Sequence, residues 1–258
     1  MISLYKRLLF SCLLSLFATV AVAATPGSSE SGPKDELKSE QKGDLKIKPE
    51  KEPVQTSIAI LGDSLADGLY IGMVQLSRIN KNLSVKKYSR VNTGITRYDR
   101  YDWTSAAEEI SKEDKSDVYL LMFGANDLQS IREESKRYHF PSEEWGKRYV
   151  ARIDDITKAL KKTERKIYWV GLPIVGKKAY AEGYKHLNSL FATRAAANGV
   201  TFIDSWDWFA SEEGDFQASG EGADGKKKLL RAKDMVHFTG AGYVDLATYV
   251  AREIKLIQ

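Results

Sequence analysis

The stretch LGDSLADGL, residues 61–69, contains a serine that could act as a nucleophile. An apolar run ends at Gly62, and Asp63 and Ser64 follow before an apolar, helix-like pattern resumes. Aspartate and serine are also favoured at the first positions of helices, so the same residues fit an ordinary turn and helix cap. A reactive serine would need a base, an acid that orients the base, and donors for an oxyanion elsewhere in the chain.

One of the three histidines has a carboxylate close to it in the sequence. His139 precedes a proline in a loop-like segment without a nearby acid, and His186 lies in a helical pattern. His237, in AKDMVHFTGAGY, follows Asp234 by three residues. In a loop this spacing can bring the carboxylate to the imidazole Nδ1–H, leaving Nε2 free to accept a serine proton. The alternative is that Asp234 caps a turn and His237 only precedes the last helix.

Three groups could donate hydrogen bonds to an oxyanion. The backbone N–H of Gly94 has no side chain to obstruct approach, and Asn126 carries a side-chain NH₂. The backbone N–H of Ser64 would be a third donor, helped by the helix dipole, if this serine begins a helix. Taken separately, Gly94 and Asn126 also fit ordinary turns.

The elements that would position these residues alternate along the chain from Ser57 onward. We predict five strands, at 57–62, 83–89, 117–124, 166–173 and 200–205. We predict five helices, near 65–80, 102–113, 143–162, 178–198 and 241–256. This alternation indicates right-handed crossovers and a three-layer α/β/α sandwich around a central parallel five-stranded sheet. Ser64 and the polar loops 91–103 and 123–130 would then meet at the carboxyl ends of the strands, where such sheets bind ligands.

Taken together, these residues resemble the SGNH (GDSL-type) hydrolase superfamily. Four sequence blocks occur in the family's order: GDSLADG with Ser64, NTG with Gly94, GAND with Asn126, and DMVH with Asp234 and His237. The resemblance covers residues 57–258. The stretches NTGITRYDRYDW, GLPIV, FIDSWDWF and HFTGAGY also resemble a periplasmic branch whose members are largely unassigned.

The resemblance implies a flavodoxin-like SGNH fold and a Ser-His-Asp triad. Ser64 would attack an ester, His237 would act as base and then acid, and Asp234 would orient it. The oxyanion would be held by the Ser64 amide, Gly94 and Asn126. The other serine-hydrolase plan, the Gly-x-Ser-x-Gly elbow, does not match, because the sequence reads Gly-Asp-Ser-Leu-Ala here.

The expected substrate is an acylated glycan or a small ester. We expect a serine esterase that removes O-acyl groups, O-acetyl first among them, from an envelope or extracellular glycan. An O-acetyltransferase with the same triad is the main alternative, followed by a lipase or arylesterase and then by a non-catalytic glycan-binding scaffold. Residues expected to contact substrate are Asp63, Arg97, Tyr98 and Asp127.

Composition argues against several other classes of partner. The formal net charge is +4 and no dense basic stripe is present, so we expect no nucleic-acid partner. The acids of segment 211–233 do not follow a calcium-loop spacing, and we expect neither a metal nor a cofactor. Nothing in the sequence specifies an oligomeric state.

The N-terminal residues have the pattern of a secretory signal. Lys6 and Arg7 precede an apolar stretch, and Ala21-Val22-Ala23 is a small-residue cleavage site, so we predict a signal peptide at 1–23 and a periplasmic or secreted protein without membrane insertion. A retained anchor is the alternative, since the uncharged stretch has 18 residues, from Leu8 to Thr25. Cleavage would remove Cys12, the only cysteine. Residues 24–56, rich in Lys, Glu, Pro and Ser, are expected to be a disordered linker.

Overall fold

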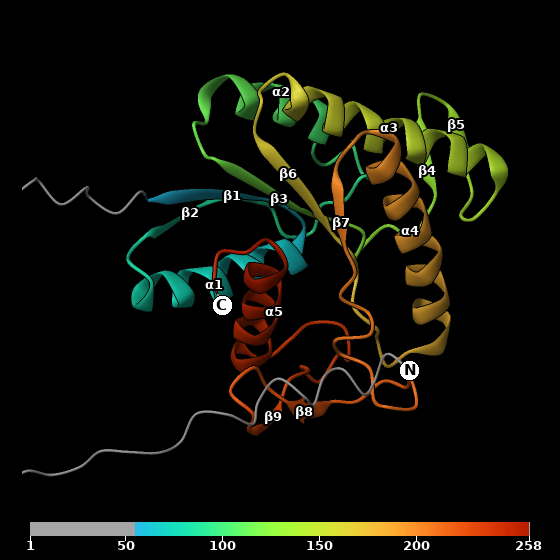
Figure 1. Cartoon of the computed structure of the whole chain (residues 1–258). Helices are drawn as coiled ribbons and strands as arrows, with labels where there is room; N and C mark the ends of the chain where they lie inside the picture. Colours follow the sequence, from blue (N-terminus) through green and yellow to red (C-terminus); the bar gives the residue numbers. More distant parts are fainter. Residues whose placement is uncertain (1–54, 258) are drawn as a thin grey trace, which may run out of the picture. The chain divides into compact units, whose positions relative to one another are not determined.

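The computed structural model describes residues 55–257 (Figure 1). The expected signal peptide lies outside the described residues, and so does the expected linker except for its last two positions. One of these, Thr56, is the first residue of a strand, because its N–H donates to Asn82 O at 2.7 Å. The first strand therefore begins one residue before the predicted strand 57–62. No helix within residues 55–257 has the length and apolar character needed to span a bilayer.

The centre of the fold is a parallel sheet of five strands. In the order β2-β1-β3-β6-β7, neighbouring strands are hydrogen-bonded and all run the same way. The strands are β1 (Thr56–Gly62), β2 (Leu83–Ser89), β3 (Val118–Met122), β6 (Lys166–Val170) and β7 (Thr201–Ile203). This confirms the predicted three-layer α/β class. The order reverses between β1 and β3, and open parallel sheets bind their ligands beyond the carboxyl ends of the strands at such a point.

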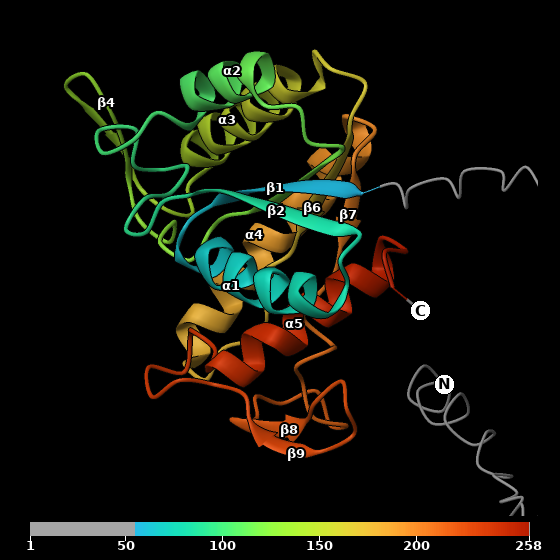
Figure 2. The same cartoon turned by 90° about the vertical axis from the view of Figure 1, so that its left-hand side faces the viewer.

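Helices cover both faces of the sheet. On one side lie α1 (Ser64–Ile79) and α5 (Gly240–Glu253), and on the other lie α2 (Trp103–Glu113) and α3 (Glu143–Lys161) (Figures 1 and 2). The fifth helix, α4 (Lys178–Ala197), packs against β6, β7 and α3. All five begin within one residue of their predicted starts, because apolar spacing and the capping residues before four of them are local signals.

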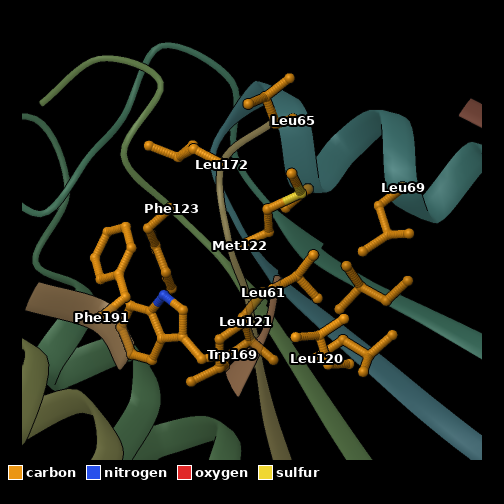
Figure 3. Close-up of a cluster of buried hydrophobic side chains, with 14 of the residues drawn as sticks. Leu61, Leu65, Leu69, Leu120, Leu121, Met122, Phe123, Trp169, Leu172 and Phe191 are labelled. Carbon is orange, nitrogen blue, oxygen red and sulfur yellow. The ribbon is translucent and has the colours of Figure 1, made fainter. Parts of the chain in front are cut away.

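The core follows from the apolar runs of the central strands. Every residue of β3 is buried, as are the last five of β1, which is typical of parallel strands covered on both faces. Figure 3 shows Leu61, Leu121 and Met122 of these strands beside Trp169 of β6 and Phe191 of α4. The edge strand β2 is less apolar and exposes Lys86 and Lys87.

Two antiparallel hairpins were not anticipated from the sequence. They consist of β4 (Ile131–Glu133) with β5 (Lys136–Tyr138), and β8 (Ser219–Glu221) with β9 (Lys227–Leu229). Each strand has three residues, too few for an alternating pattern to stand out. The second hairpin falls within segment 211–233, in which we predicted no strand.

Candidate active site

Ser64 is presented by the tight turn between β1 and α1. Gly62 has φ 144°, and a Cβ at this position would lie 1.9 Å from Met122 O. Asp63 is the N-cap of α1, and its Oδ1 accepts the N–H of Leu65 at 2.9 Å. Ser64 is thus the first residue of the helix, where a backbone N–H has no partner within the helix. The serine is thus both a helix-initiating residue and partly buried at the carboxyl end of β1.

Ser64, His237 and Asp234 form a continuous chain of hydrogen bonds. The distance from Ser64 Oγ to His237 Nε2 is 2.8 Å, although the two residues are 173 positions apart. His237 Nδ1 lies 2.6 Å from Asp234 Oδ2. An imidazole held in this way donates its Nδ1 proton to the carboxylate and offers Nε2 as an acceptor to the serine hydroxyl.

Asp234 is held in its ionised form. Partial burial raises the pKa of this carboxyl, but hydrogen bonds from the His237 ring and from the N–H groups of Val236 and His237 outweigh burial and lower the pKa to about 2. Both of these N–H groups donate to Oδ1 at 3.0 Å, which leaves Oδ2 for the imidazole. The carboxylate therefore stays negative across the pH range in which an imidazole titrates.

The loop that carries this pair is held by the chain on both sides of it. The N–H of Ala232 donates to His237 O at 2.9 Å, and the N–H of Met235 donates to Ala232 O at 3.0 Å. Met235 itself has φ 61°. The buried Arg231 donates Nη1 to Val236 O at 3.0 Å, and its guanidinium lies 3.9 Å from the centre of the Phe238 ring. The acid and the base therefore lie in one tight turn, in which Asp234 both caps the backbone N–H groups and reaches the imidazole.

The two other expected oxyanion residues lie in neighbouring loops. Asn126 Nδ2 donates to Thr93 O at 2.9 Å, which joins the loop after β3 to the residue before Gly94. The loop after β2 is also tied to the serine turn, because the N–H of Arg90 donates to Gly62 O at 2.8 Å. Within residues 55–257, the N–H of Gly94 donates to no protein acceptor. The structure thus brings the serine, glycine and asparagine loops to one edge of the sheet.

The side chain of Asp63, which we expected to contact substrate, is completely buried. Its Oδ2 accepts the N–H groups of Gly124 and Ala125 at 2.9 and 2.8 Å, and its Oδ1 caps α1. Burial raises the pKa of Asp63 to about 7, against the opposing effect of these backbone donors. Asp63 is therefore a brace between the serine turn and the asparagine loop.

Asp127, also expected to contact substrate, is a second completely buried brace. Its carboxylate accepts the N–H groups of Ile95 and Thr96, both at 3.1 Å, and the hydroxyls of Thr96 and Tyr149 at 2.7 and 2.9 Å. Burial raises the pKa of this carboxyl. A Cβ at Gly94 would lie 2.2 Å from Asp127 Oδ1, so only glycine leaves room for this arrangement.

The remaining two expected substrate contacts are engaged within the protein. Arg97 pairs with Asp99 at 2.7 Å. Tyr98 is partly buried, its hydroxyl lies 2.8 Å from Thr104 Oγ1, and the Arg152 guanidinium lies 4.0 Å from the centre of its ring. Both side chains stabilise the loop that follows Gly94. The sequence did carry a signal for the bracing aspartates, since Asp63 and Asp127 directly adjoin Ser64 and Asn126.

Within the part of the chain that the structure describes, no group of three or more His, Cys, Asp or Glu side chains is placed to hold a metal ion. The groups that the structure brings together at the candidate site are a hydroxyl, an imidazole, a carboxylate and hydrogen-bond donors. This set can perform nucleophilic attack with general base assistance.

Comparison of the chain with known protein families gives a match over most of its length. A family model described as "Protein of unknown function (DUF459)" matches residues 57–253. No curated protein sequence matches the chain.

Solved structures of SGNH hydrolases have the same fold. A GDSL-like lipase from Bacteroides thetaiotaomicron is 14% identical with a TM-score of 0.52, covering 78% of this chain and 88% of its own. A catalytic mutant of an acetylxylan esterase from Geobacillus stearothermophilus is 16% identical with a TM-score of 0.55, covering 78% and 96%. The periplasmic domain of a lipopolysaccharide acetyltransferase from Salmonella ser. Paratyphi A is 15% identical with a TM-score of 0.51, covering 79% and 85%. The resemblance inferred from the sequence is confirmed at the level of the fold.

Proposed function

The chain belongs to the DUF459 family, whose function is unknown, and we propose that this member is a serine esterase that uses Ser64, His237 and Asp234. The observation that carries the proposal is the unbroken hydrogen-bonded chain, 2.8 Å from Ser64 to His237 and 2.6 Å from His237 to Asp234. A serine that only forms part of a turn or a helix cap would not need an imidazole oriented toward its hydroxyl.

In the proposed reaction, Ser64 Oγ attacks the ester carbonyl and passes its proton to His237 Nε2. The carbonyl oxygen becomes an oxyanion, for which the N–H groups of Ser64 and Gly94 and the Asn126 amide are the donors. Collapse of this intermediate breaks the bond to the alcohol, which leaves with the proton from His237. Water then attacks the acyl-serine with the same imidazole as base, and the acid product leaves.

The proposed substrate is an O-acetylated glycan of the cell envelope or extracellular space. Two of the structurally similar proteins are named for acetyl groups on polysaccharides, an acetylxylan esterase and a lipopolysaccharide acetyltransferase. The secretory pattern of residues 1–23 supports a periplasmic or secreted location, where such polymers occur.

An O-acetyltransferase is the second candidate function. It is favoured by the similarity to the periplasmic domain of an acetyltransferase. The acyl-serine would be the same, but a sugar hydroxyl would replace water in the second step. Adding an oligosaccharide acceptor to the reaction separates the two, since acetyl appears on the acceptor for a transferase and as free acetate for a hydrolase.

The purified protein should release acetate from p-nitrophenyl acetate and from O-acetylated oligosaccharides. Ser64→Ala should lower the rate to the uncatalysed background, while Ser77→Ala, at the other end of the same helix, should keep the wild-type rate. Both variants should retain the wild-type circular dichroism spectrum. Activity that survives Ser64→Ala would exclude the proposed nucleophile. Turnover of long-chain esters with no turnover of acetylated sugars would favour a lipase.

A further inference from the structure

A surface pocket of about 360 Å³ lies beside the candidate active site. Its walls come from α1, from the end of β2 and from the two arms of the loop that carries Gly94, with Arg90 and Thr93 on one arm and Arg100 and Tyr101 on the other. The volume is within the range of ligand pockets, which starts at about 300 Å³. None of the proposed catalytic side chains lines it.

The pocket carries an unbalanced positive charge. Its only acid, Asp67, accepts a hydrogen bond from Ser89 at 2.8 Å and pairs with Lys87 at 2.6 Å, so these two charges cancel. Arg90 and Arg100 are exposed and form no ion pair with any residue in 55–257. The acid next to Arg100, Asp99, is occupied by Arg97 at 2.7 Å. Two guanidinium groups are therefore left to face a ligand.

Arg90 is held in position although it forms no ion pair within the described residues. Its guanidinium lies 4.4 Å from the centre of the Tyr101 ring, and its N–H is bonded to Gly62 O. A stacked guanidinium keeps its hydrogen-bonding edge free, and this planar edge matches a carboxylate or a phosphate. Because stacking already restricts the Arg90 side chain, less of its conformational entropy is lost when a ligand binds.

The pocket is close enough to Ser64 to bind another part of the same substrate molecule. Asp67 follows Ser64 by three residues on α1, a spacing that places Cβ atoms about 5–6 Å apart on one face of a helix. Thr93 directly precedes Gly94, and its carbonyl accepts the Asn126 amide at 2.9 Å. A ligand in the pocket therefore lies next to the oxyanion donors.

We propose that this pocket binds an anionic group, a carboxylate or a phosphate, carried by the acylated glycan near the ester that Ser64 attacks. Arg90 and Arg100 are the specificity residues. The preferred substrate is thus an acidic glycan rather than a neutral one. This inference rests on the proposed function for the ester chemistry, but the binding itself does not require turnover.

The test compares three esters: an O-acetylated oligogalacturonide, O-acetylated glucose 6-phosphate and a neutral O-acetylated xylo-oligosaccharide. In the wild-type protein, kcat/KM for one of the two anionic esters should exceed that for the neutral ester about tenfold or more. Arg90→Gln and Arg100→Gln should each lower this ratio about tenfold, chiefly by raising KM. The matched control, Arg78→Gln, removes the same charge from the far end of α1 and should leave the ratio unchanged.

The two anionic esters distinguish a carboxylate from a phosphate as the recognised group. The preference should also fall as salt concentration rises, because the arginines are exposed to solvent. Equal kcat/KM for all three esters, or a preference that persists in both arginine variants, overturns the inference.

Binding to the Ser64→Ala variant separates this inference from the proposed esterase function. Calorimetry with the oligogalacturonide and the sugar phosphate should give a Kd that rises about tenfold when Arg100→Gln is added. If the wild-type protein hydrolyses no ester, the esterase proposal fails, and this binding result alone decides the pocket. Absence of binding, or binding unaffected by Arg100→Gln, overturns the pocket while leaving any esterase activity in place.

Discussion

At the scale of single residues, the site depends on matching each polar group to one partner. The two oxygens of Asp234 are divided, with Oδ1 on backbone N–H groups and Oδ2 on the imidazole. This division determines which nitrogen of His237 carries the proton and which faces Ser64. The side chains of His237 and Asp234 are 37% and 49% exposed, so surrounding packing does not fix the imidazole ring. The hydrogen bond to Asp234 orients it.

Replacing Asp234 by Asn should remove the charge and keep the shape. We expect kcat for an ester substrate to fall about 10⁴-fold, because an amide that presents its NH₂ to Nδ1 selects the wrong imidazole tautomer. The measurement is steady-state hydrolysis of p-nitrophenyl acetate. Asp155→Asn, an exposed position on α3, is the control and should keep the wild-type rate. A loss of less than tenfold would show that Asp234 does not orient the base.

Asn126→Ala should act on the transition state rather than on binding. Removal of one oxyanion donor lowers kcat by about 10²–10³-fold with little change in KM. Asn82→Ala, in the exposed turn before β2, is the control. A raised KM with unchanged kcat would instead make Asn126 a substrate-binding residue.

At the scale of elements, two buried aspartates hold three loops in register. Asp63 links the serine turn to the loop after β3, and Asp127 links that loop to the one containing Gly94. Each carboxylate accepts N–H groups from a segment distant in sequence. Because such buried carboxylates are costly unless they are fully bonded, the loops are locked together rather than merely adjacent.

Gly94→Ala should disturb the hydrogen bonds by which Asp127 holds the loop that contains Gly94. The new Cβ would lie 2.2 Å from Asp127 Oδ1, so the loop must shift. We expect the free energy of unfolding to fall by about 1–3 kcal/mol, and kcat/KM to fall about 10²-fold because the oxyanion donor moves. Urea denaturation and ester hydrolysis measure the two effects.

The control for this change is Gly146→Ala, in α3, where a Cβ meets nothing within 4 Å. It should stabilise the protein by about 0.5–1 kcal/mol, since alanine is favoured over glycine in a helix. Wild-type activity in the Gly94→Ala variant would mean that the loop tolerates the shift and that Gly94 is not a precisely placed donor.

At the scale of the whole molecule, the brace at Asp63 couples stability to pH. Its pKa is raised by burial from 3.8 to about 7. Between these values the folded protein keeps a proton that the unfolded chain releases, so the free energy of unfolding falls as pH rises from about 4 to about 7. This single group contributes about 4 kcal/mol at most across that range. Asp234, with its pKa lowered to about 2, has the opposite effect, and its stabilisation is lost as pH falls below about 4.

Denaturation measured from pH 4 to pH 8 should therefore show a smaller decrease in the Asp63→Asn variant than in the wild-type protein, because the variant lacks this titration. Asp155→Asn should reproduce the wild-type slope, since that side chain is exposed. An unchanged slope in Asp63→Asn would mean that Asp63 is ionised in the folded protein at acidic pH.

The sequence alone was sufficient for the parallel five-stranded sheet and the five helices, because apolar periodicity and capping residues depend on neighbours within a few residues. The three-residue spacing of Asp234 and His237 left two interpretations open, and only the resemblance to a known family favoured their pairing. The short hairpins β4–β5 and β8–β9 were not predicted, because strands of three residues are too short to show an alternating apolar pattern. The start of β1 at Thr56 depends on a partner strand that the local sequence does not reveal.

Only the tertiary structure decided which polar side chains are buried or paired and which stay exposed beside the candidate site. Asp63 and Asp127 were expected to contact substrate, but their carboxylates accept hydrogen bonds from N–H groups of other loops. Arg97, also expected to contact substrate, is paired with Asp99. Arg90 and Arg100 line the pocket beside the candidate site and form no ion pair within residues 55–257. Burial and charge pairing are properties of residues that are far apart in the chain, as are Ser64 and His237. The residue types determined which chemistry is available, and the fold determined which groups are free to perform it.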